Sequence, residues 1–213
     1  MIEPYYQKGS IVIYNNDCLE VMKQFKDKTF NLILTDPPKR HKQAMGRGGG
    51  VTKHINYTPF KWDNQIPPRE YFNEMFRVSE DQIIFGGNYF VEYLRNSSCW
   101  LVWDKDNGKT SFADCELCWT SFKGAIRKFK WRWNGMLQED MKHKEKRYHP
   151  TQKPVGLLLQ ILERYPAKTI LDPFMGSGST LIAARKLGID AIGIEMNKEY
   201  CDIAVKRLEK EGK

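Results

Sequence analysis

The stretch ILDPFMGSGSTLIAA, residues 170–184, decides the fold of this chain. It begins with an apolar run that ends at Asp172, continues through a Gly-Ser-Gly-Ser turn, and ends with the apolar periodicity of a helix. Gly176 and Gly178 lack a Cβ, so the backbone can turn sharply there and a ligand can approach it closely. Amides exposed at the start of the next helix favour a carboxylate or a phosphate. The stretch predicts a strand, a ligand-binding turn and a helix.

An acid about twenty residues further on sharpens this interpretation. Glu195 ends the apolar stretch 189–195, where a carboxylate can accept hydrogen bonds from ribose hydroxyls. A Gly-x-Gly turn alone is a weak signal, since many such turns serve packing only. The turn and the acid together indicate a nucleoside site. The full G-x-G-x-x-G pattern and a P-loop Lys are both missing, which argues against a dinucleotide or a nucleoside triphosphate.

Strands and helices alternate along the chain. Strands are expected at 10–17, 30–35, 81–87, 98–105, 114–122, 127–133, 168–172 and 189–196, and helices at 18–25, 68–79, 154–165, 179–187 and 197–213. This order predicts an α/β fold with a mostly parallel sheet covered by helices on both faces. The length of 213 residues suggests a single domain over 1–213. Segment 39–66 is rich in Gly and bases without periodicity, so we expect a mobile, functional connection there.

A second candidate site lies in NLILTDPPKRH, residues 31–41. Asp36 directly follows the strand 30–35. Ligands bind outside the carboxyl ends of strands in open α/β sheets, so Asp36 and the glycine turn would open on the same side. Proline cannot donate a hydrogen bond. Asp36 and the Pro37 carbonyl would therefore offer acceptors only, which suits an exocyclic amine.

Four motifs in this order resemble the DNA amino-methyltransferases of the beta group: DPP (36–38), TQKP (151–154), DPFMGSGST (172–180) and IGIEMNKEY (192–200). The resemblance covers nearly the whole chain. It implies a Rossmann-like methyltransferase domain with a seven-stranded-type sheet and a small target-recognition insertion. It also implies methyl transfer from S-adenosylmethionine to N6 of adenine or N4 of cytosine in double-stranded DNA, with the base flipped into the pocket. The Asp form of the catalytic motif favours adenine, and cytosine is the alternative.

The resemblance also assigns roles to individual residues. Asp36 and Pro37 would hold the target amine, beside Pro38 and Lys39, and Glu195 would bind the ribose of the cofactor. Thr151, Gln152 and Lys153 would close its methionine end, and Asp17 and Cys18 would lie beside its adenine ring. The remaining cofactor positions are Asp172, Phe174, Gly176, Ser177, Gly178, Ser179 and Thr180.

Lys39 departs from the family pattern, which has an aromatic residue, usually Tyr, stacking on the flipped base. Three interpretations stay open: a loss of activity, a base stacked by another aromatic residue, or a changed substrate. Tyr57, Phe60 and Trp62 are the candidates for substitute stacking. A solvated Lys is less favoured because the position follows the rigid Pro-Pro. A protein of this fold that binds cofactor and DNA without chemistry is therefore an alternative function.

Basic segments are the candidates for DNA contact. The formal net charge is +8 and the pI is near 9.1, which favours a polyanionic partner. The segment 127–150 stands where the family carries its target-recognition region. In RKFKWRW (127–133), an aromatic face packed on the core is at least as plausible as base stacking. The DNA-binding candidates are Lys39, Arg40, Lys42, Arg47, Lys128, Lys130, Arg132, Lys142, Lys144, Lys146 and Arg147.

The cysteine content and the hydropathy of the chain indicate its cellular compartment. Five Cys without a framework of spacings indicate a reducing compartment, and CELC (115–118) favours buried thiols in a strand over a metal site. No apolar run reaches the roughly 20 residues that span a membrane, so a cytoplasmic protein is expected. The family resemblance implies a bacterial or phage-like system. The family resemblance makes a homodimer plausible and leaves a restriction-enzyme partner unknown.

Overall fold

The chain was analysed as a computed structural model that describes residues 2–39, 66–108, 110, 113–134, 137–148 and 151–211. A nine-stranded sheet in the order β1-β2-β11-β10-β3-β4-β6-β5-β7 forms its centre. Its strands are β1 (Tyr6–Lys8), β2 (Ile11–Tyr14), β3 (Phe30–Thr35), β4 (Ser79–Phe85), β5 (Trp100–Asp104), β6 (Cys115–Thr120), β7 (Arg127–Lys130), β10 (Thr169–Asp172) and β11 (Asp190–Ile194). A separate hairpin joins β8 (Trp133–Asn134) and β9 (Leu137–Gln138). The helices are α1 (Cys18–Met22), α2 (Arg69–Val78), the 3-10 turn η2 (Gly87–Tyr89), α3 (Val155–Arg164), α4 (Ser179–Lys186) and α5 (Lys198–Glu211).

The expected α/β fold with a mostly parallel sheet is confirmed. Strands β2, β11, β10, β3 and β4 run parallel to one another, and β6 joins the sheet antiparallel between β4 and β5. The described sheet has nine strands rather than seven, because β1 pairs antiparallel with β2 at one edge and β7 pairs parallel with β5 at the other. Neither edge strand changes the central parallel order that the motifs occupy.

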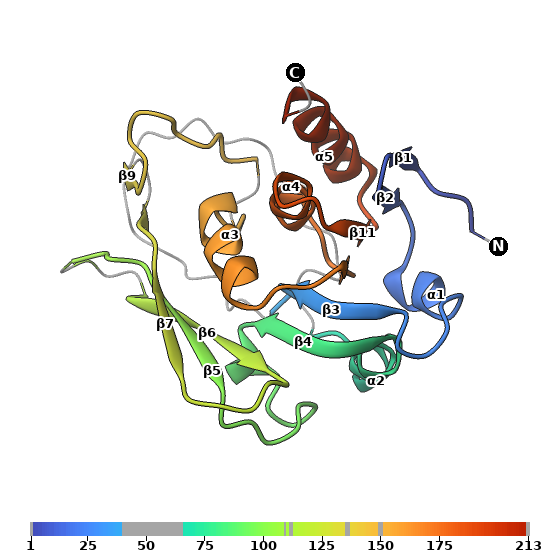
Figure 1. The fold of residues 1–213 in the computed structure, drawn as a ribbon, viewed down its shortest axis with the longest axis horizontal. Coiled ribbons are helices and arrows are strands. Elements are labelled where there is room, and N and C mark those ends of the chain that lie inside the picture. The colour runs from blue at the N-terminus through green and yellow to red at the C-terminus, as the bar shows by residue number, and fades with distance from the viewer. Residues whose placement is uncertain are drawn as a thin grey trace.

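Helices cover both faces of the sheet, with α3, α4 and α5 on one side and α1 and α2 on the other (Figure 1). The alternation of side chains along each strand makes this possible. On β3, Leu32 and Leu34 pack into the core beneath α3, α4 and α5, whereas Ile33 packs with the buried residues of α1 and α2. Strands buried on both faces read as continuous apolar runs, which is why FNLILT is so apolar.

The parallel order brings the two predicted motifs to one edge of the sheet. Strand β10 lies between β11 and β3, and all three run in the same direction. The residues at or just beyond their carboxyl ends are Asp172, Glu195 and Asp36. The prediction that the glycine turn and DPP open on the same side is confirmed.

Two local expectations need correction. The strand predicted over 127–133 ends at Lys130, because its partner β5 ends at Asp104 and the Trp131 amide makes the last ladder bond, to the Asp104 carbonyl (3.0 Å). The aromatic face nevertheless packs inward: Phe129 and Trp133 are buried, and Trp131 lies against Gly156. In CELC, Cys118 is buried as expected but Cys115 is exposed. Among the described residues, no group of His, Cys, Asp or Glu could hold a metal ion.

None of the described helices has both the length and the apolar character needed to cross a bilayer.

Gly178→Ala is expected to destabilise the fold by roughly 1–3 kcal/mol, through backbone strain and overpacking. Gly178 has φ +81°, and a Cβ there would lie 2.8 Å from the Cβ of Ala204 in α5. Urea unfolding of the variant measures the loss. Gly176→Ala is the matched control, because φ is +51° there but no atom lies within 4 Å of the added Cβ. An equal loss in both variants would mean that packing against Ala204 contributes nothing.

Candidate active site

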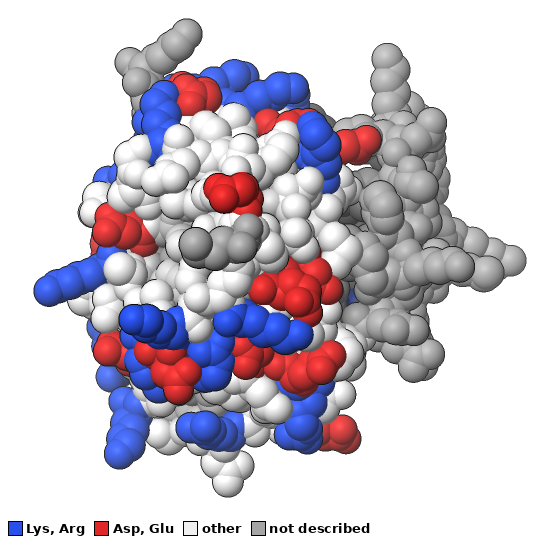
Figure 2. Space-filling view, turned by 90° about the vertical axis from the view of Figure 1, so that its right-hand side faces the viewer, with Lys and Arg blue, Asp and Glu red and all other residues white. Residues whose placement is uncertain are grey.

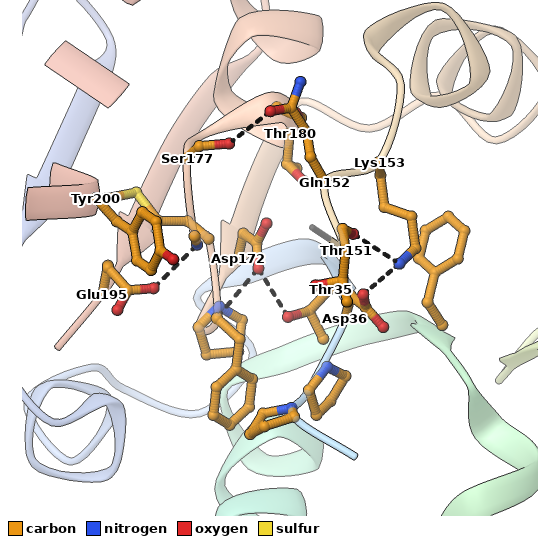
Figure 3. A pocket seen from close by; sticks show the side chains of 18 of the residues that line it. Thr35, Asp36, Thr151, Gln152, Lys153, Asp172, Ser177, Thr180, Glu195 and Tyr200 are labelled. Atoms are coloured by element: carbon orange, nitrogen blue, oxygen red, sulfur yellow. Dashed lines mark hydrogen bonds and ion pairs between the residues drawn. The ribbon is translucent and has the colours of Figure 1, made fainter. Parts of the chain in front are cut away.

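A cavity of about 670 Å³ opens at the carboxyl ends of β3, β10 and β11. This volume is within the range of small-molecule sites. Thr35 to Lys39, Thr151 to Lys153 and the glycine turn all contribute to its wall, so three segments far apart in the sequence meet there (Figure 3). All the predicted catalytic residues line the cavity: Asp36, Pro37, Pro38 and Lys39. Every predicted cofactor residue also lines it except Gly178, whose missing Cβ makes room for α5 instead.

The glycine turn is tied to Glu195. The Gly176 amide donates to Glu195 Oε2 (3.1 Å), and the Asn197 amide donates to Glu195 Oε1 (2.7 Å). Gly176 takes a positive φ of +51°, which turns its amide toward the carboxylate. Glu195 is only 8% exposed, yet it lines the cavity. Its carboxylate is thus held at one orientation in the cavity wall.

Two further side chains hold the glycine turn from behind. Arg207 of α5 is buried, and its Nη1 donates to the Ser177 carbonyl (2.7 Å) and to Ser179 Oγ (3.2 Å). Gln152 Oε1 accepts from Ser177 Oγ (3.3 Å) and from the Tyr148 amide (2.9 Å). The TQKP turn therefore joins the glycine turn to segment 145–148. Sequence reasoning missed Arg207, because one base in a mixed amphipathic helix carries no signal.

Two stacked aromatic rings, Tyr71 and Phe174, lie near Asp17 and Cys18. Asp17 caps α1 by accepting from the Leu19 amide (2.8 Å), and Tyr71 donates its hydroxyl to Asp17 Oδ2 (2.9 Å). The Tyr71 ring lies stacked with Phe174, with centroids 6.3 Å apart and an angle of 27° between the planes. Burial raises the pKa of the Cys18 thiol, so it stays neutral. Tyr71, which the sequence did not single out, adds a flat wall suited to a ring.

Asp172 lies at the centre of the cavity wall and is 3% exposed. Its Oδ1 accepts from Thr35 Oγ1 (2.7 Å) and from the Phe174 amide (3.1 Å) (Figure 3). Burial raises the pKa of Asp172 to about 6, and these hydrogen bonds only partly oppose it. A cation bound nearby would favour the ionised form.

Both oxygens of Asp36 face lysine ammonium groups. Lys153 pairs with Oδ2, and Lys39 Nζ lies 2.9 Å from Oδ1. Lys153 is also 3.4 Å from Glu116 Oε2. Burial lowers the pKa of Lys153, but the charges of Asp36 and Glu116 outweigh burial and raise it above its usual value. Lys153 thus lines the cavity as predicted, but its carboxylate partners belong to the protein itself.

Lys39 is not a solvated side chain. Its side chain is only 11% exposed, and its ammonium lies 5.8 Å from the centre of the Tyr89 ring. Glu116, in the middle of CELC, completes this group of charges and was missed because its strand suggested only buried thiols. Burial raises the pKa of Glu116, but Lys153, Lys39 and Lys105 outweigh it and lower this pKa to about 2.

The predicted DNA-binding residues that the structure describes fall in three places. Lys128 pairs with Asp104 (3.3 Å), and both Lys130 (3.3 Å) and Arg132 pair with Asp106. The side chains of segment 142–146 that were predicted to bind DNA are exposed: Lys142, Lys144 and Lys146. Arg147 lines the cavity, with its guanidinium 4.4 Å from the centre of the Trp133 ring. Arg40, Lys42 and Arg47, and the stacking candidates Tyr57, Phe60 and Trp62, lie outside the described residues.

Charge is mixed on the face shown in Figure 2, which is the side of Figure 1 that carries β1 and α1. Lys and Arg side chains there alternate with Asp and Glu side chains. The net charge of +8 therefore forms no single basic patch on the described part of that face.

Comparison with known proteins gives consistent results. A family model described as DNA methylase matches residues 103–206. The type II methyltransferase M2.DpnII of Streptococcus pneumoniae is 25% identical over 255 residues, which covers 99% of this chain and 94% of the relative. The type II methyltransferase M2.LlaDCHI of Lactococcus lactis subsp. cremoris is 26% identical over 254 residues, covering 99% and 93%. A crystal structure of M1.HpyAVI in complex with SAM has a TM-score of 0.57 and 25% identity, covering 92% of this chain and 99% of that one.

Proposed function

The chain belongs to the DNA methylase family, and we propose that it transfers a methyl group from S-adenosylmethionine to N6 of adenine in a flipped base of double-stranded DNA. S-adenosylmethionine is the cofactor, and methylation of DNA is the activity. The choice of adenine and the roles of individual residues are the proposed parts. The cofactor supplies an electrophilic methyl group when it is bound.

One observation carries the proposal: the Asp36 carboxylate shares one cavity with Glu195 and the glycine turn. Asp36 and Glu195 both line it, on strands separated only by β10. The aromatic side chains of Tyr71 and Phe174 would pack against the adenine ring of the cofactor, and Asp17 offers a hydrogen-bond acceptor beside them. Asp36 would accept a hydrogen bond from the target amine and thereby aim the nitrogen lone pair at the methyl group. The Pro37 carbonyl would accept from the second N–H.

The target base can be tested directly. Labelled S-adenosylmethionine is incubated with mixed-sequence DNA, the DNA is hydrolysed to nucleosides, and the labelled nucleoside is identified. We expect the label on N6-methyldeoxyadenosine. Label on N4-methyldeoxycytidine would assign the cytosine alternative. Cofactor binding without label on any DNA would favour the alternative in which the fold binds cofactor and DNA without chemistry.

Glu195→Ala is expected to weaken S-adenosylmethionine binding by roughly 1.5–3 kcal/mol, the range for hydrogen bonds to a charged group. The ribose hydroxyls would lose their hydrogen bonds to the carboxylate, and calorimetry can measure the lower affinity for S-adenosylmethionine. Glu195 also orders the Gly176 and Asn197 amides, so Glu195→Gln is the matched control. The amide keeps one acceptor oxygen, and we expect a smaller loss. Unchanged affinity in a folded Ala variant would place the ribose elsewhere.

The DNA-binding surface is proposed to include segment 142–147, which leads directly into the TQKP turn. Arg147 lines the cavity at this end. Lys128, Lys130 and Arg132 have acidic partners within the chain, so they would have to exchange these for phosphates. The extent of the domain over 1–213, the target-recognition role of 127–150 and the homodimer stay predictions.

A further inference from the structure

Five charged side chains meet at the Asp36 end of the cavity, and we call them the charge cluster: Asp36, Lys39, Lys105, Glu116 and Lys153. We propose that Glu116 is a positioning residue that receives the Lys39 ammonium when a base amine approaches Asp36. The transfer of Lys39 would free Asp36 Oδ1 for the substrate. This inference rests on the proposed function, because it takes Asp36 as the group that binds the amine.

Lys39 and a substrate amine would compete for Asp36. Lys39 Nζ lies 2.9 Å from Asp36 Oδ1, at the position where an amine N–H would need to bind. Oδ1 is buried, yet it accepts no well-aligned hydrogen bond from any residue in the described ranges. The Lys39 contact is therefore an ion pair with poor hydrogen-bond geometry. A substrate N–H could satisfy this oxygen only if the ammonium moved aside.

The fold leaves room for the Lys39 side chain inside the site. Gly86 takes φ +68°, and a Cβ there would lie 2.1 Å from Lys39 Cε. The lysine stem thus occupies space that only glycine leaves. The ring of Tyr89, three residues further on, lies 5.8 Å from Nζ, within the range of a cation–π contact. Lys39 is therefore held inside the site rather than left over at its rim.

Glu116 Oε2 is placed to accept the Lys39 ammonium. Its Oε1 pairs with Lys105 (2.7 Å), whereas its buried Oε2 lies 3.4 Å from Lys153 Nζ but accepts no hydrogen bond from the described part of the chain. Lys39 Nζ is 4.0 Å from Oε2, so a shift of about 1 Å (4.0 − 2.9) would give the separation it now has from Asp36. The three lysines keep Glu116 ionised, since they lower its pKa to about 2.

The consequence is a division of work between two carboxylates. Asp36 would bind the amine through Oδ1 while Lys153 remains on Oδ2. Glu116 would hold Lys39 away from the nitrogen that becomes positively charged during methyl transfer. Without Glu116, the cluster would hold three lysines and one acid, and both Lys39 and Lys153 would depend on Asp36.

The test is a double-mutant cycle on the single-turnover rate constant of methyl transfer, followed over hours so that slow transfer is measured. We expect Glu116→Gln to lower this rate constant when Lys39 is present and to lower it at least tenfold less in the Lys39→Met background. A coupling of this size is within the range for residues in contact. Lys39→Met alone should raise the constant.

Lys105→Met is the matched control, because it removes a lysine from Glu116 without touching Asp36. It should raise the rate constant much less than Lys39→Met. An equal gain, or an equal effect of Glu116→Gln in both backgrounds, would overturn the proposal. If Glu116→Gln loses cofactor binding through misfolding, Lys39→Arg decides: a gain with Met but not with Arg supports competition at Asp36, and a gain with neither overturns it. Cofactor binding without methyl transfer by any variant would instead overturn the proposed function.

Discussion

Asp36→Ala is expected to lower the rate of methyl transfer by roughly 10²–10⁴-fold or more, while the affinity for S-adenosylmethionine stays nearly unchanged. The carboxylate would act on the amine chiefly in the reacting geometry, so its loss lowers the rate rather than ground-state binding. The residues that we propose to bind the nucleoside, Glu195, Tyr71 and Phe174, are held by contacts that do not involve Asp36. Single-turnover transfer and calorimetry of cofactor binding measure the two effects separately.

Asp36→Asn is the control for this experiment. Removing one partner of a buried ion pair can destabilise a protein by about 3–5 kcal/mol, and Asp36 is the partner of Lys153. The amide preserves the shape and one acceptor oxygen, so we expect a smaller rate loss than with Ala. Urea unfolding of both variants separates lost chemistry from lost fold. An undiminished rate in folded Asp36→Ala would show that the active site lies elsewhere.

Lys39→Tyr is expected to raise the rate of methyl transfer by roughly tenfold to a hundredfold, because base–aromatic stacking contributes about 1–3 kcal/mol. The substitution adds a stacking face for the flipped base. It also removes the ammonium 2.9 Å from Asp36, which opposes positive charge on the amine. Binding of S-adenosylmethionine should change little. Transfer of labelled methyl to DNA, compared between the two chains, gives the ratio.

Lys39→Met separates the two causes, since it removes the charge without adding a ring. A larger gain with Tyr than with Met would measure the stacking contribution. Equal gains would mean that only the ammonium matters, and that another aromatic residue already stacks on the base. Full activity of the Lys39 chain, not improved by Tyr, would contradict the prediction and direct substitution to Tyr57, Phe60 and Trp62, and to Tyr89 beside Lys39.

The sequence by itself determined the order of the elements and the two ends of the site. Strand β3 has the predicted bounds, and β10 with α4 follows the predicted strand, turn and helix within one residue. These predictions succeeded because apolar runs, periodicity and a glycine turn are local signals. The parallel sheet then followed from alternation of strands and helices, and it implied that Asp36, Asp172 and Glu195 share an edge.

Only the tertiary structure decided which charges meet. Lys39, Glu116 and Lys153 are separated by dozens of residues, and no periodicity links a lysine after DPP to an acid in CELC. Their contact arises because β6 joins the sheet beside β4 and the TQKP turn folds over β3. The same holds for Gly178, which the sequence predicted to lie in a ligand-binding turn but whose missing Cβ leaves room for Ala204. Residue types and local spacing can be read along a chain, whereas the pairing of side chains across strands depends on packing that the whole fold creates.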